Sequence, residues 1–530
     1  MVPSVDRMKS CSFLLSIAVI VAATVLFPDE VESAKILCFF PSPSKSHVLG
    51  PQRLLKNLAN RGHEVTMVSE FPLTKPVKNY RDIYVQAENE FAAIMAEVMQ
   101  GGNQSMITMI PTAIKASLEY TNKSLNSPQF QQLIREERFD LVILGFFMND
   151  FIVGVGPLLK CPTILYYSAG LSELVNVVGN PREIASVPQA HLGRKSSMTF
   201  FDRLMNVVLN LMETLFHTYI QYQSRIYYRN NFPSEKGFPS YEEAKLNVSL
   251  LMYNSHFTQT SPRPLLPNAI EVGGLQIKPE PDPLPEEIQA WLDGAEEHGA
   301  IFLSFGSNLK SSTLQQEKLE AIIGTLGKLK QRVIWKWDTD RMPGKPANVL
   351  VGKWLPQDDI LAHTNLKLFI THGGQGSVTE AMYHGVPIVG IPIMADQDTN
   401  AAQVVRDGWG EVVPFDELTE AKLTAAVQRV LSDGKYSERV KQIATLFRDR
   451  PHSALDLATY WVEYVVRHKG AKHLHYLGAD LNFMQRSLID VAAFVAVALY
   501  VIYKLSRFTL GKIKKVVCGR IRRENKLKFN

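Results

Sequence analysis

Short apolar runs alternate along this chain with longer stretches in which apolar residues recur every three to four positions. The apolar runs in the first half are residues 34–40, 63–69, 139–145 and 161–167. Residues 49–59, between the first two runs, carry the helical spacing, so strand, helix and strand follow one another as in a βαβ unit. We therefore expect a doubly wound α/β domain over residues 34–277.

The pattern restarts after a proline-rich segment. Residues 278–287 hold four prolines, which donate no backbone hydrogen bond, so we expect a linker there. The apolar runs after it are residues 300–307, 332–337, 366–371 and 386–392. They predict a second Rossmann-like domain over residues 288–470, and two such lobes enclose a cleft at the carboxyl ends of their strands.

Two helical segments do not follow the strand–helix alternation of the two predicted lobes. Residues 200–220 are amphipathic, and we expect their apolar face to pack into the core; contact with a membrane or with an acceptor pocket is the alternative. Residues 436–468 are helical and charged, and we expect them to cross back to the first lobe.

Each end of the chain carries an apolar segment. Near the N-terminus, basic residues, an apolar run and small residues follow one another, which predicts a signal peptide over residues 1–33. Near the C-terminus, residues 488–505 have about the length and composition of a transmembrane helix. This helix would follow a juxtamembrane segment, residues 471–487, and precede a basic tail, residues 506–530, whose charge places the tail in the cytosol.

The tail also suggests a location. Lys526 and Lys528 resemble the dilysine signal that retrieves type I proteins to the endoplasmic reticulum. We therefore expect a single-pass type I protein of that membrane, with its body in the lumen. Glycosylation sequons at Asn103, Asn122 and Asn247 fit a lumenal body.

Charge and cysteine content narrow the function classes. The net charge of +5 arises in the tail, since residues 504–530 hold ten Lys or Arg and one Glu, which leaves +5 − 9 = −4 for the rest. An acidic body argues against nucleic-acid binding. With four cysteines, of which Cys38 and Cys161 lie in the body, no disulfide framework is indicated.

The most informative stretch is FITHGGQGSVTEAMYHG, residues 369–385, in which an apolar strand ends at His372 and a helix follows. Gly374 and Gly376 allow the backbone to approach a ligand, and the amides of Gly376 and Ser377 open the helix, whose N-terminus favours anions. His372 can donate to a diphosphate as charge builds on it. Glu380, one turn further, can accept from two ribose hydroxyls.

Together with two Rossmann-like lobes, this stretch resembles the UDP-glycosyltransferases, in particular their membrane-bound UDP-glucuronosyltransferase branch. Further blocks of the resemblance are PRPLLPN (262–268), VGGL (272–275), FGS (305–307) and WLPQ (354–357). The resemblance implies the GT-B architecture and a UDP-sugar donor. It also implies donor-binding roles for Ser307 at the phosphate, Trp354 and Leu355 at uracil, Gln357 at the nucleoside, and Asp396 and Gln397 at the sugar hydroxyls.

The same resemblance implies a catalytic base in the first lobe. Inverting transfer needs a base that deprotonates the acceptor, and His47, in the loop after the first strand, matches the catalytic histidine of the family. The carboxylate that usually orients this histidine aligns with Gly145 here. We hypothesise that Asp150 takes its place; a backbone carbonyl as partner, or an impaired enzyme, are the alternatives.

The remaining choices concern substrates and partners. We expect transfer of a hexose, with UDP-glucose favoured over UDP-glucuronate, to a small lipophilic acceptor, and no cofactor or metal besides the UDP-sugar co-substrate. Aspartate pairs at 338/340 and 396/398 suggest a metal-binding Asp-x-Asp motif, which we discount because helix, amides and His372 already neutralise the phosphates. The alternative function is a weakly active binding or partner subunit, and a receptor ectodomain is a third. Whether the protein forms a homo-oligomer stays open.

Overall fold

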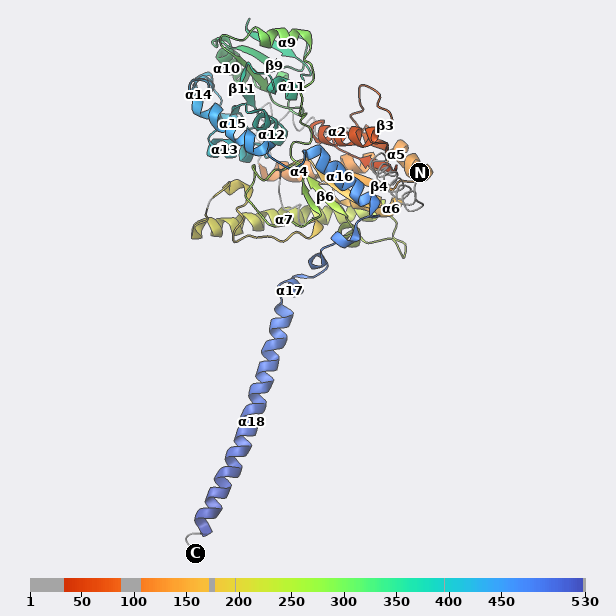
Figure 1. The fold of residues 1–530 in the computed structure, drawn as a ribbon, viewed down its shortest axis with the longest axis vertical. Coiled ribbons are helices and arrows are strands. Elements are labelled where there is room, and N and C mark those ends of the chain that lie inside the picture. The colour runs from red at the N-terminus through yellow and green to blue at the C-terminus, as the bar shows by residue number, and fades with distance from the viewer. Residues whose placement is uncertain (1–32, 87–105, 171–176, 196, 395, 528–530) are drawn as a thin grey trace, which may run out of the picture. The chain divides into compact units, whose positions relative to one another are not determined.

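The structure is a computed structural model that describes residues 33–86, 106–170, 177–195, 197–394 and 396–527 (Figure 1). The chain falls into two compact units, Met1–His475 and Tyr476–Asn530. The first unit contains two parallel sheets, and the second contains the C-terminal helix. The predicted signal peptide and the sequon at Asn103 lie outside the described residues.

The first sheet has seven strands in the order β3-β2-β1-β4-β5-β6-β7, and each neighbouring pair is parallel. The strands are β1 (Lys35–Phe39), β2 (Glu64–Ser69), β3 (Tyr80–Tyr84), β4 (Leu141–Gly145), β5 (Thr163–Tyr167), β6 (Leu250–Tyr253) and β7 (Ala269–Glu271). The chain order reverses at β1, which lies between β2 and β4. In a doubly wound sheet, such a switch point opens a crevice for a ligand.

Helices cover both faces of this sheet because successive strand residues point to opposite sides. Ile36 and Cys38 of β1 pack toward α2 (Ser46–Asn60) and α16 (Ala454–Arg467), whereas Leu37 and Phe39 pack on the other face. That other face also carries α4 (Met106–Leu125), α5 (Pro128–Glu136), η1 (Asp150–Gly154), α6 (Val155–Leu159), α7 (Phe200–Asn231) and α8 (Tyr241–Leu246). Both faces of β1 are therefore buried, which explains its unbroken apolar run.

The second sheet has six parallel strands in the order β10-β9-β8-β11-β12-β13. They are β8 (Ala300–Ser304), β9 (Arg332–Lys336), β10 (Val349–Gly352), β11 (Leu366–Thr371), β12 (Ile388–Gly390) and β13 (Gly410–Val412). Here the order reverses at β8, between β9 and β11. Both predicted Rossmann-like sheets are thus present, each with its own switch point.

The second sheet is also covered on both faces. One core cluster contains α10 (Gln316–Gly327) and α14 (Glu420–Ser432). The opposite cluster contains α9 (Glu286–Asp293), α11 (Gln357–Leu361), α12 (Gln375–His384), α13 (Gln397–Asp407) and α15 (Gly434–Arg448). The proline-rich residues 278–285 form neither helix nor strand before α9 begins.

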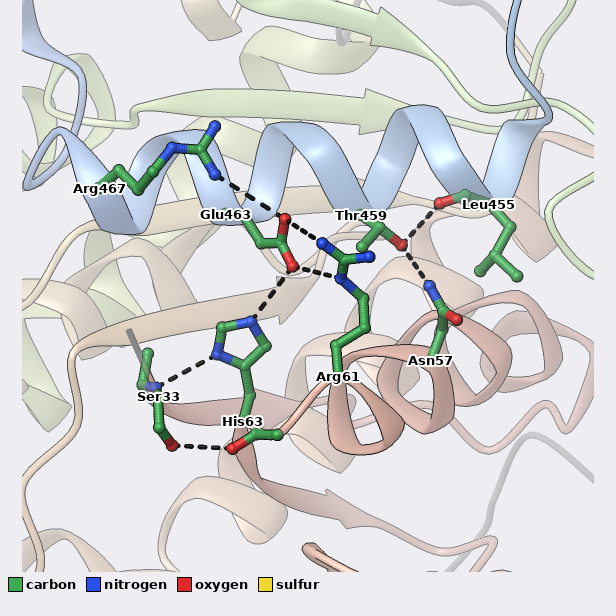
Figure 2. Close-up of polar contacts among 10 residues, drawn as sticks. Ser33, Asn57, Arg61, His63, Leu455, Thr459, Glu463 and Arg467 are labelled. Atoms are coloured by element: carbon green, nitrogen blue, oxygen red, sulfur yellow. Dashed lines mark hydrogen bonds and ion pairs between the residues drawn. The ribbon is translucent and has the colours of Figure 1, made fainter. Parts of the chain in front are cut away.

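The chain returns to the first lobe through α16, as its charged helical sequence led us to expect (Figure 2). Glu463 of α16 is 4% exposed and accepts two hydrogen bonds from Arg61, at 2.6 and 3.1 Å. His63 Nε2 lies 3.4 Å from the same carboxylate, and its Nδ1 accepts from the Ala34 amide. The buried carboxylate is therefore paired, and α16 is fixed to α2 far from it in sequence.

The amphipathic helix α7 differs from our expectation. Its apolar residues in the stretch from Phe200 to Leu215 are mostly exposed, and its buried residues there are Asn206 and Asn210. The prediction that the apolar face of residues 200–220 packs into the core is therefore wrong for residues 200–215, whereas Phe216 and Ile220 do pack into the first-lobe core. The reason is that this part of α7 lies on an irregular segment, residues 182–189, whose backbone groups bond to polar side chains.

The second unit contains α17 (Phe483–Arg486) and α18 (Ile489–Leu527). Residues 489–523 of α18 are long and apolar enough to cross a membrane, and none of the most apolar window is buried. The helix begins where the sequence predicts a span and continues through the basic tail.

Candidate active site

Three of the sequence-predicted site residues lie at the two switch points. His47 is the second residue of α2, directly after the loop that leaves β1. His372 follows β11, and Ser307 follows β8. Since ligands bind in doubly wound folds at the carboxyl ends of the strands beside a switch point, both lobes present these residues at the expected edge.

His47 is held by a serine. Its Nδ1 lies 3.0 Å from Ser42 Oγ, and its ring packs on Phe147 with centroids 4.8 Å apart. Burial lowers the pKa of His47 to about 4, so the imidazole is neutral at neutral pH. When Nδ1 donates to Ser42, the lone pair of Nε2 is available to accept a proton.

Asp150 belongs to a different cluster. It begins η1, which packs against α7 and α8, and its buried carboxyl interacts with Lys245 and the Tyr241 hydroxyl. Burial raises the pKa of Asp150, and the charge of Lys245 opposes this rise. The structure thus pairs His47 with Ser42, not with Asp150 as we hypothesised, because η1 directs the Asp150 carboxyl toward α8.

Gly145 has no room for the carboxylate that the resemblance implies. It ends β4, and a Cβ added there would lie 2.5 Å from Cδ1 of Phe40. The ring of Phe40 is buried and already fills this space. Glycine at 145 and phenylalanine at 40 therefore fit one another, and a side chain at 145 would displace the ring.

His372 lies between two glycines of the second lobe. A Cβ added at Gly306 would lie 2.6 Å from its Cε1, and one added at Gly374 would lie 2.5 Å from its Nε2. Gly306 and Gly373 also have φ of +79° and +82°, which favour glycine. Burial and the nearby charge of Lys336 lower the pKa of His372 to about 4.

Two lysines that the sequence reasoning missed lie beside these residues. Lys336, the last residue of β9, donates to the Gly306 carbonyl, and burial followed by repulsion from Lys45 lowers its pKa to about 8. Lys45 Nζ lies 3.6 Å from the ring centroid of Trp354, and Lys336 Nζ lies 5.1 Å from it. The signal for Lys336 was available, since a lysine follows the apolar residues 333–335 at the end of a strand next to the switch point.

Trp354 and Leu355 differ in exposure. Trp354 is 52% exposed, whereas Leu355 is 7% exposed and belongs to the second-lobe core. The Trp354 face that we expect to stack on uracil is therefore accessible to solvent, except where the ammonium groups of Lys45 and Lys336 lie over the ring.

Glu380 is held by two glutamines from different parts of the chain. Gln357 Nε2 lies 2.7 Å from one carboxyl oxygen and 3.2 Å from Ser377 Oγ, and Gln276 Nε2 lies 3.2 Å from the other carboxyl oxygen. Burial, with repulsion from Asp358, raises the pKa of Glu380 to about 8. Gln276, from the segment after β7, was not predicted, because nothing in its local sequence connects it with α12.

The predicted sugar-contacting pair starts α13. Asp396 accepts from Asn400 Nδ2 at 2.8 Å, and Asn400 also donates to the Gly373 carbonyl. Gln397 Oε1 accepts the amides of Ile393 and Met394, at 2.9 and 3.1 Å. The Asn400 bond links α13 to the glycine turn at residues 373–376, and the Gln397 bonds hold the loop that precedes α13.

A pocket of about 100 Å³ lies between the lobes, next to this turn. Its lining includes Arg194, Gln259 and Arg263 from the first lobe and Gln375, Asn400 and Trp409 from the second. It is smaller than the roughly 300 Å³ of a typical ligand site, and none of the predicted donor-binding residues lines it.

The aspartate pairs have separate partners. Asp338 accepts from the Ser312 amide at 3.0 Å, and Asp340 pairs with Lys353 at 2.7 Å. In the part of the chain that the structure describes, no group of three or more His, Cys, Asp or Glu side chains is arranged to hold a metal ion.

Comparison with known proteins agrees with this geometry. Residues 34–523 match the family model "UDP-glucoronosyl and UDP-glucosyl transferase". UDP-glucosyltransferase 2 of Dactylopius coccus is 38% identical over 88% of this chain and 90% of its own length. UDP-glucuronosyltransferase 1A10 of Homo sapiens is 30% identical over 85% of this chain and 86% of its own.

A solved structure shows the same fold. A UDP-glucosyltransferase from Polygonum tinctorium superposes with a TM-score of 0.52 at 16% identity, over 82% of this chain and 99% of its own. Two facing doubly wound lobes, a histidine at each switch point and the family match over nearly the whole chain lead to one conclusion. The chain belongs to the UDP-glucuronosyl and UDP-glucosyl transferase family and is a glycosyltransferase.

Proposed function

We propose that this protein transfers glucose from UDP-glucose to a small lipophilic acceptor, with inversion at the anomeric carbon and with His47 as the general base. The observation that carries the proposal is the pairing of His47 Nδ1 with Ser42, which leaves Nε2 facing away from its hydrogen-bond partner. Glucose is favoured because the relative at 38% identity is named a UDP-glucosyltransferase.

In this reaction, His47 Nε2 takes the proton of the acceptor hydroxyl while the oxygen of that hydroxyl attacks the anomeric carbon. The bond from that carbon to the β-phosphate oxygen breaks at the same time, and UDP leaves with the electron pair. An attack opposite to the leaving group inverts the configuration. Ser42 orients the ring through Nδ1 but carries no charge, so it supports the imidazolium less than a carboxylate would.

The second lobe stabilises the charge that develops on UDP. His372, the amides of Gly376 and Ser377 at the start of α12, and Lys336 lie around the glycine turn and can all donate to phosphate oxygens. Ser307 adds a hydroxyl from the neighbouring turn. This scheme uses protein groups throughout, and we expect turnover to be unchanged by EDTA.

The nucleoside and sugar contacts complete the donor site. Trp354 stacks on uracil beside the Leu355 backbone, and Lys45 leaves that ring face when uracil binds. Gln357 and Glu380 contact the ribose, and Asp396 and Gln397 contact the sugar hydroxyls. Asp150 is not needed in this scheme, since its contacts are with α8.

Turnover with each donor tests the function. We expect UDP release from UDP-glucose, with a panel of phenols, to exceed release from UDP-glucuronate, and His47→Ala to abolish it. Equal turnover by wild type and His47→Ala would remove His47 as the base. Absence of turnover with both donors would favour the second candidate, a partner subunit, which Gly145 and its fit to Phe40 support.

We also propose an endoplasmic-reticulum membrane location with a lumenal body. The support is α18 with its basic C-terminal half. Asn247 is exposed and is a suitable reporter. Its glycan should be sensitive to endoglycosidase H in wild type, and Asn247→Gln should remove one glycan; an unglycosylated wild-type chain would contradict a lumenal body.

A further inference from the structure

The two lysines beside Trp354 place two positive charges on one aromatic ring. Lys45 Nζ lies 3.6 Å from the centroid of the indole ring, and Lys336 Nζ lies 5.1 Å from it. Within the described residues, no carboxylate forms an ion pair with either ammonium group. A cation–π contact compensates a cation less well than an anion does, so each lysine lacks its usual partner.

Each ammonium group raises the electrostatic cost of the other. Burial lowers the pKa of Lys45, and burial followed by repulsion from Lys45 lowers the pKa of Lys336 to about 8. Asp338 opposes this shift less strongly, and its carboxyl oxygens accept from the amide and the hydroxyl of Ser312. The described chain thus supplies little counter-charge at this ring, and an anionic ligand would stabilise both lysines.

The two lysines belong to different lobes. Lys336 ends β9 of the second lobe and donates to the Gly306 carbonyl, beside the ring of His372. Lys45 belongs to the first lobe, in the loop that joins β1 to α2. Positive charge from both lobes therefore meets at Trp354, the residue that we place at the nucleoside end of the donor site.

The backbone around Lys45 is held by hydrogen bonds, whereas its ammonium group rests on the indole ring. The Ser44 amide donates to Ser42 Oγ at 3.2 Å, and Ser44 Oγ lies 2.8 Å from Ser46 Oγ. The face of Trp354 is also where we expect uracil to stack, so the ammonium group has to leave the ring when the nucleotide binds. A lysine side chain can make this movement while its backbone stays in place, because its four-carbon stem is flexible.

A bound UDP offers the displaced ammonium group one charged partner. The uracil ring and the ribose hydroxyls are neutral, whereas the diphosphate is anionic. Lys336 lies between the Trp354 ring and the Gly306 carbonyl, so it extends from the expected uracil site toward His372, where we place the diphosphate. An ammonium group binds phosphate as a compact point charge, which suits a side chain that has to move.

We propose that Lys45 is a donor-binding residue contributed by the first lobe. When uracil stacks on Trp354, the Lys45 ammonium group moves from the indole ring to the diphosphate, opposite Lys336 and His372. The ligand of this composite site is a nucleoside diphosphate, which both lobes then hold. The inference rests on the proposed UDP-sugar donor, and it gives the Trp354 ring two successive partners, Lys45 in the free protein and uracil in the complex.

Calorimetry with UDP and with uridine tests the inference, because two roles of Lys45 predict opposite signs. The full chain in nanodiscs is titrated with each ligand, as wild type and as Lys45→Met. If Lys45 binds the diphosphate, the variant should bind UDP about tenfold more weakly and uridine at least as tightly as wild type does. If Lys45 only competes with uracil for the ring, the variant should bind both ligands more tightly, which would overturn the inference.

Two further variants control for charge and for folding. Lys45→Arg keeps the positive charge, so its affinity for UDP should stay within about threefold of wild type. Lys56→Met removes an exposed lysine from α2 of the same lobe and should bind UDP as wild type does. Equal weakening of UDP and uridine binding in Lys45→Met would indicate a disturbed loop and would also overturn the inference.

The choice of ligands separates this inference from the proposed function. A loss in Lys45→Met that is confined to UDP-glucuronate, with UDP bound as by wild type, would assign Lys45 to the sugar carboxylate and reject the diphosphate contact. A wild-type chain that binds UDP, with no loss in Lys45→Met, rejects the inference and leaves the UDP-sugar donor in place. A wild-type chain that binds neither UDP nor UDP-glucose rejects the proposed donor and the inference together.

Discussion

Ser42 Oγ lies 3.0 Å from Nδ1 of His47, at the position where a catalytic histidine commonly has a carboxylate partner. A neutral hydroxyl orients the ring but does not neutralise the imidazolium that proton transfer creates. The proposed base is therefore positioned by a hydrogen bond within the loop after β1 and by the ring of Phe147, which follows the strand that ends at Gly145.

Removing the serine should affect catalysis more than binding. We expect Ser42→Ala to lower kcat about tenfold, as loss of one orienting hydrogen bond does, with KM for UDP-glucose nearly unchanged. Ser46→Ala, in the same loop, is the control, because its hydroxyl bonds to Ser44 and not to the imidazole. If Asp150→Asn lowered kcat and Ser42→Ala did not, the assignment of the positioning residue would be reversed.

If His47 is the base, its low pKa should set the acidic limb of the pH profile. A base acts when it is deprotonated, so activity is lost as pH falls through its pKa. With burial lowering the pKa of His47 to about 4, kcat/KM should stay level from pH 7 to about pH 5 and decline below that. Steady-state rates between pH 4 and 8 measure this limb; a decline centred near pH 6.5 would show that the imidazole is not desolvated.

Glycine at position 374 is required for the observed position of the His372 imidazole. The added methyl of Gly374→Ala would lie 2.5 Å from Nε2, so the imidazole must move away from the diphosphate. We expect KM for the UDP-sugar to rise by about 10- to 100-fold, the equivalent of one charge-assisted hydrogen bond. Gly434→Ala, at the start of α15, is the control, because no atom lies within 4 Å of the added methyl, and it should bind UDP as wild type does. Equal losses in both variants would point to a general effect on the lobe.

Glu380 makes the stability of the free protein pH-dependent. Its pKa is raised from 4.5 to about 8 in the fold, so the folded state binds more protons than the unfolded state between these values, and stability falls as pH rises through this window. Thermal unfolding at pH 5 and pH 8 should show a larger fall in Tm for wild type than for Glu380→Gln. Ribose hydroxyls donate to the ionised carboxylate, so UDP binding should release a proton near pH 7, which calorimetry in two buffers detects.

Lys336 should contribute charge at the diphosphate. It lies at the end of β9, donates to the Gly306 carbonyl and borders His372. Lys336→Met should raise KM for the UDP-sugar about tenfold and weaken its dependence on salt, because one cation is lost near the phosphates. Lys353→Met is the matched control, as Lys353 pairs with Asp340 on the exposed surface of the same lobe. Identical behaviour of the two variants would place Lys336 outside the donor site.

The sequence by itself determined the two doubly wound sheets and the donor signature. Apolar runs buried on both faces, such as β1 and β8, have to form central parallel strands, and the glycine turn from Gly373 to Gly376 can follow such a strand only at its carboxyl edge. The same reasoning selected His372 and Glu380 as candidates because their positions relative to a strand or a helix start are local properties, and the family resemblance implied His47.

Only the tertiary structure decided which distant groups meet. Gln276 contacts Glu380, and Lys45 contacts Trp354, across more than one hundred residues of sequence. The spacing of apolar residues along the chain does not predict such contacts. The partner of His47 depended on the direction of η1, which turns Asp150 toward α8. The outward face of α7 was decided by backbone groups in residues 184–189 whose hydrogen bonds need Asn206 inward, and these bonds outweigh burial of the exposed apolar side chains of α7.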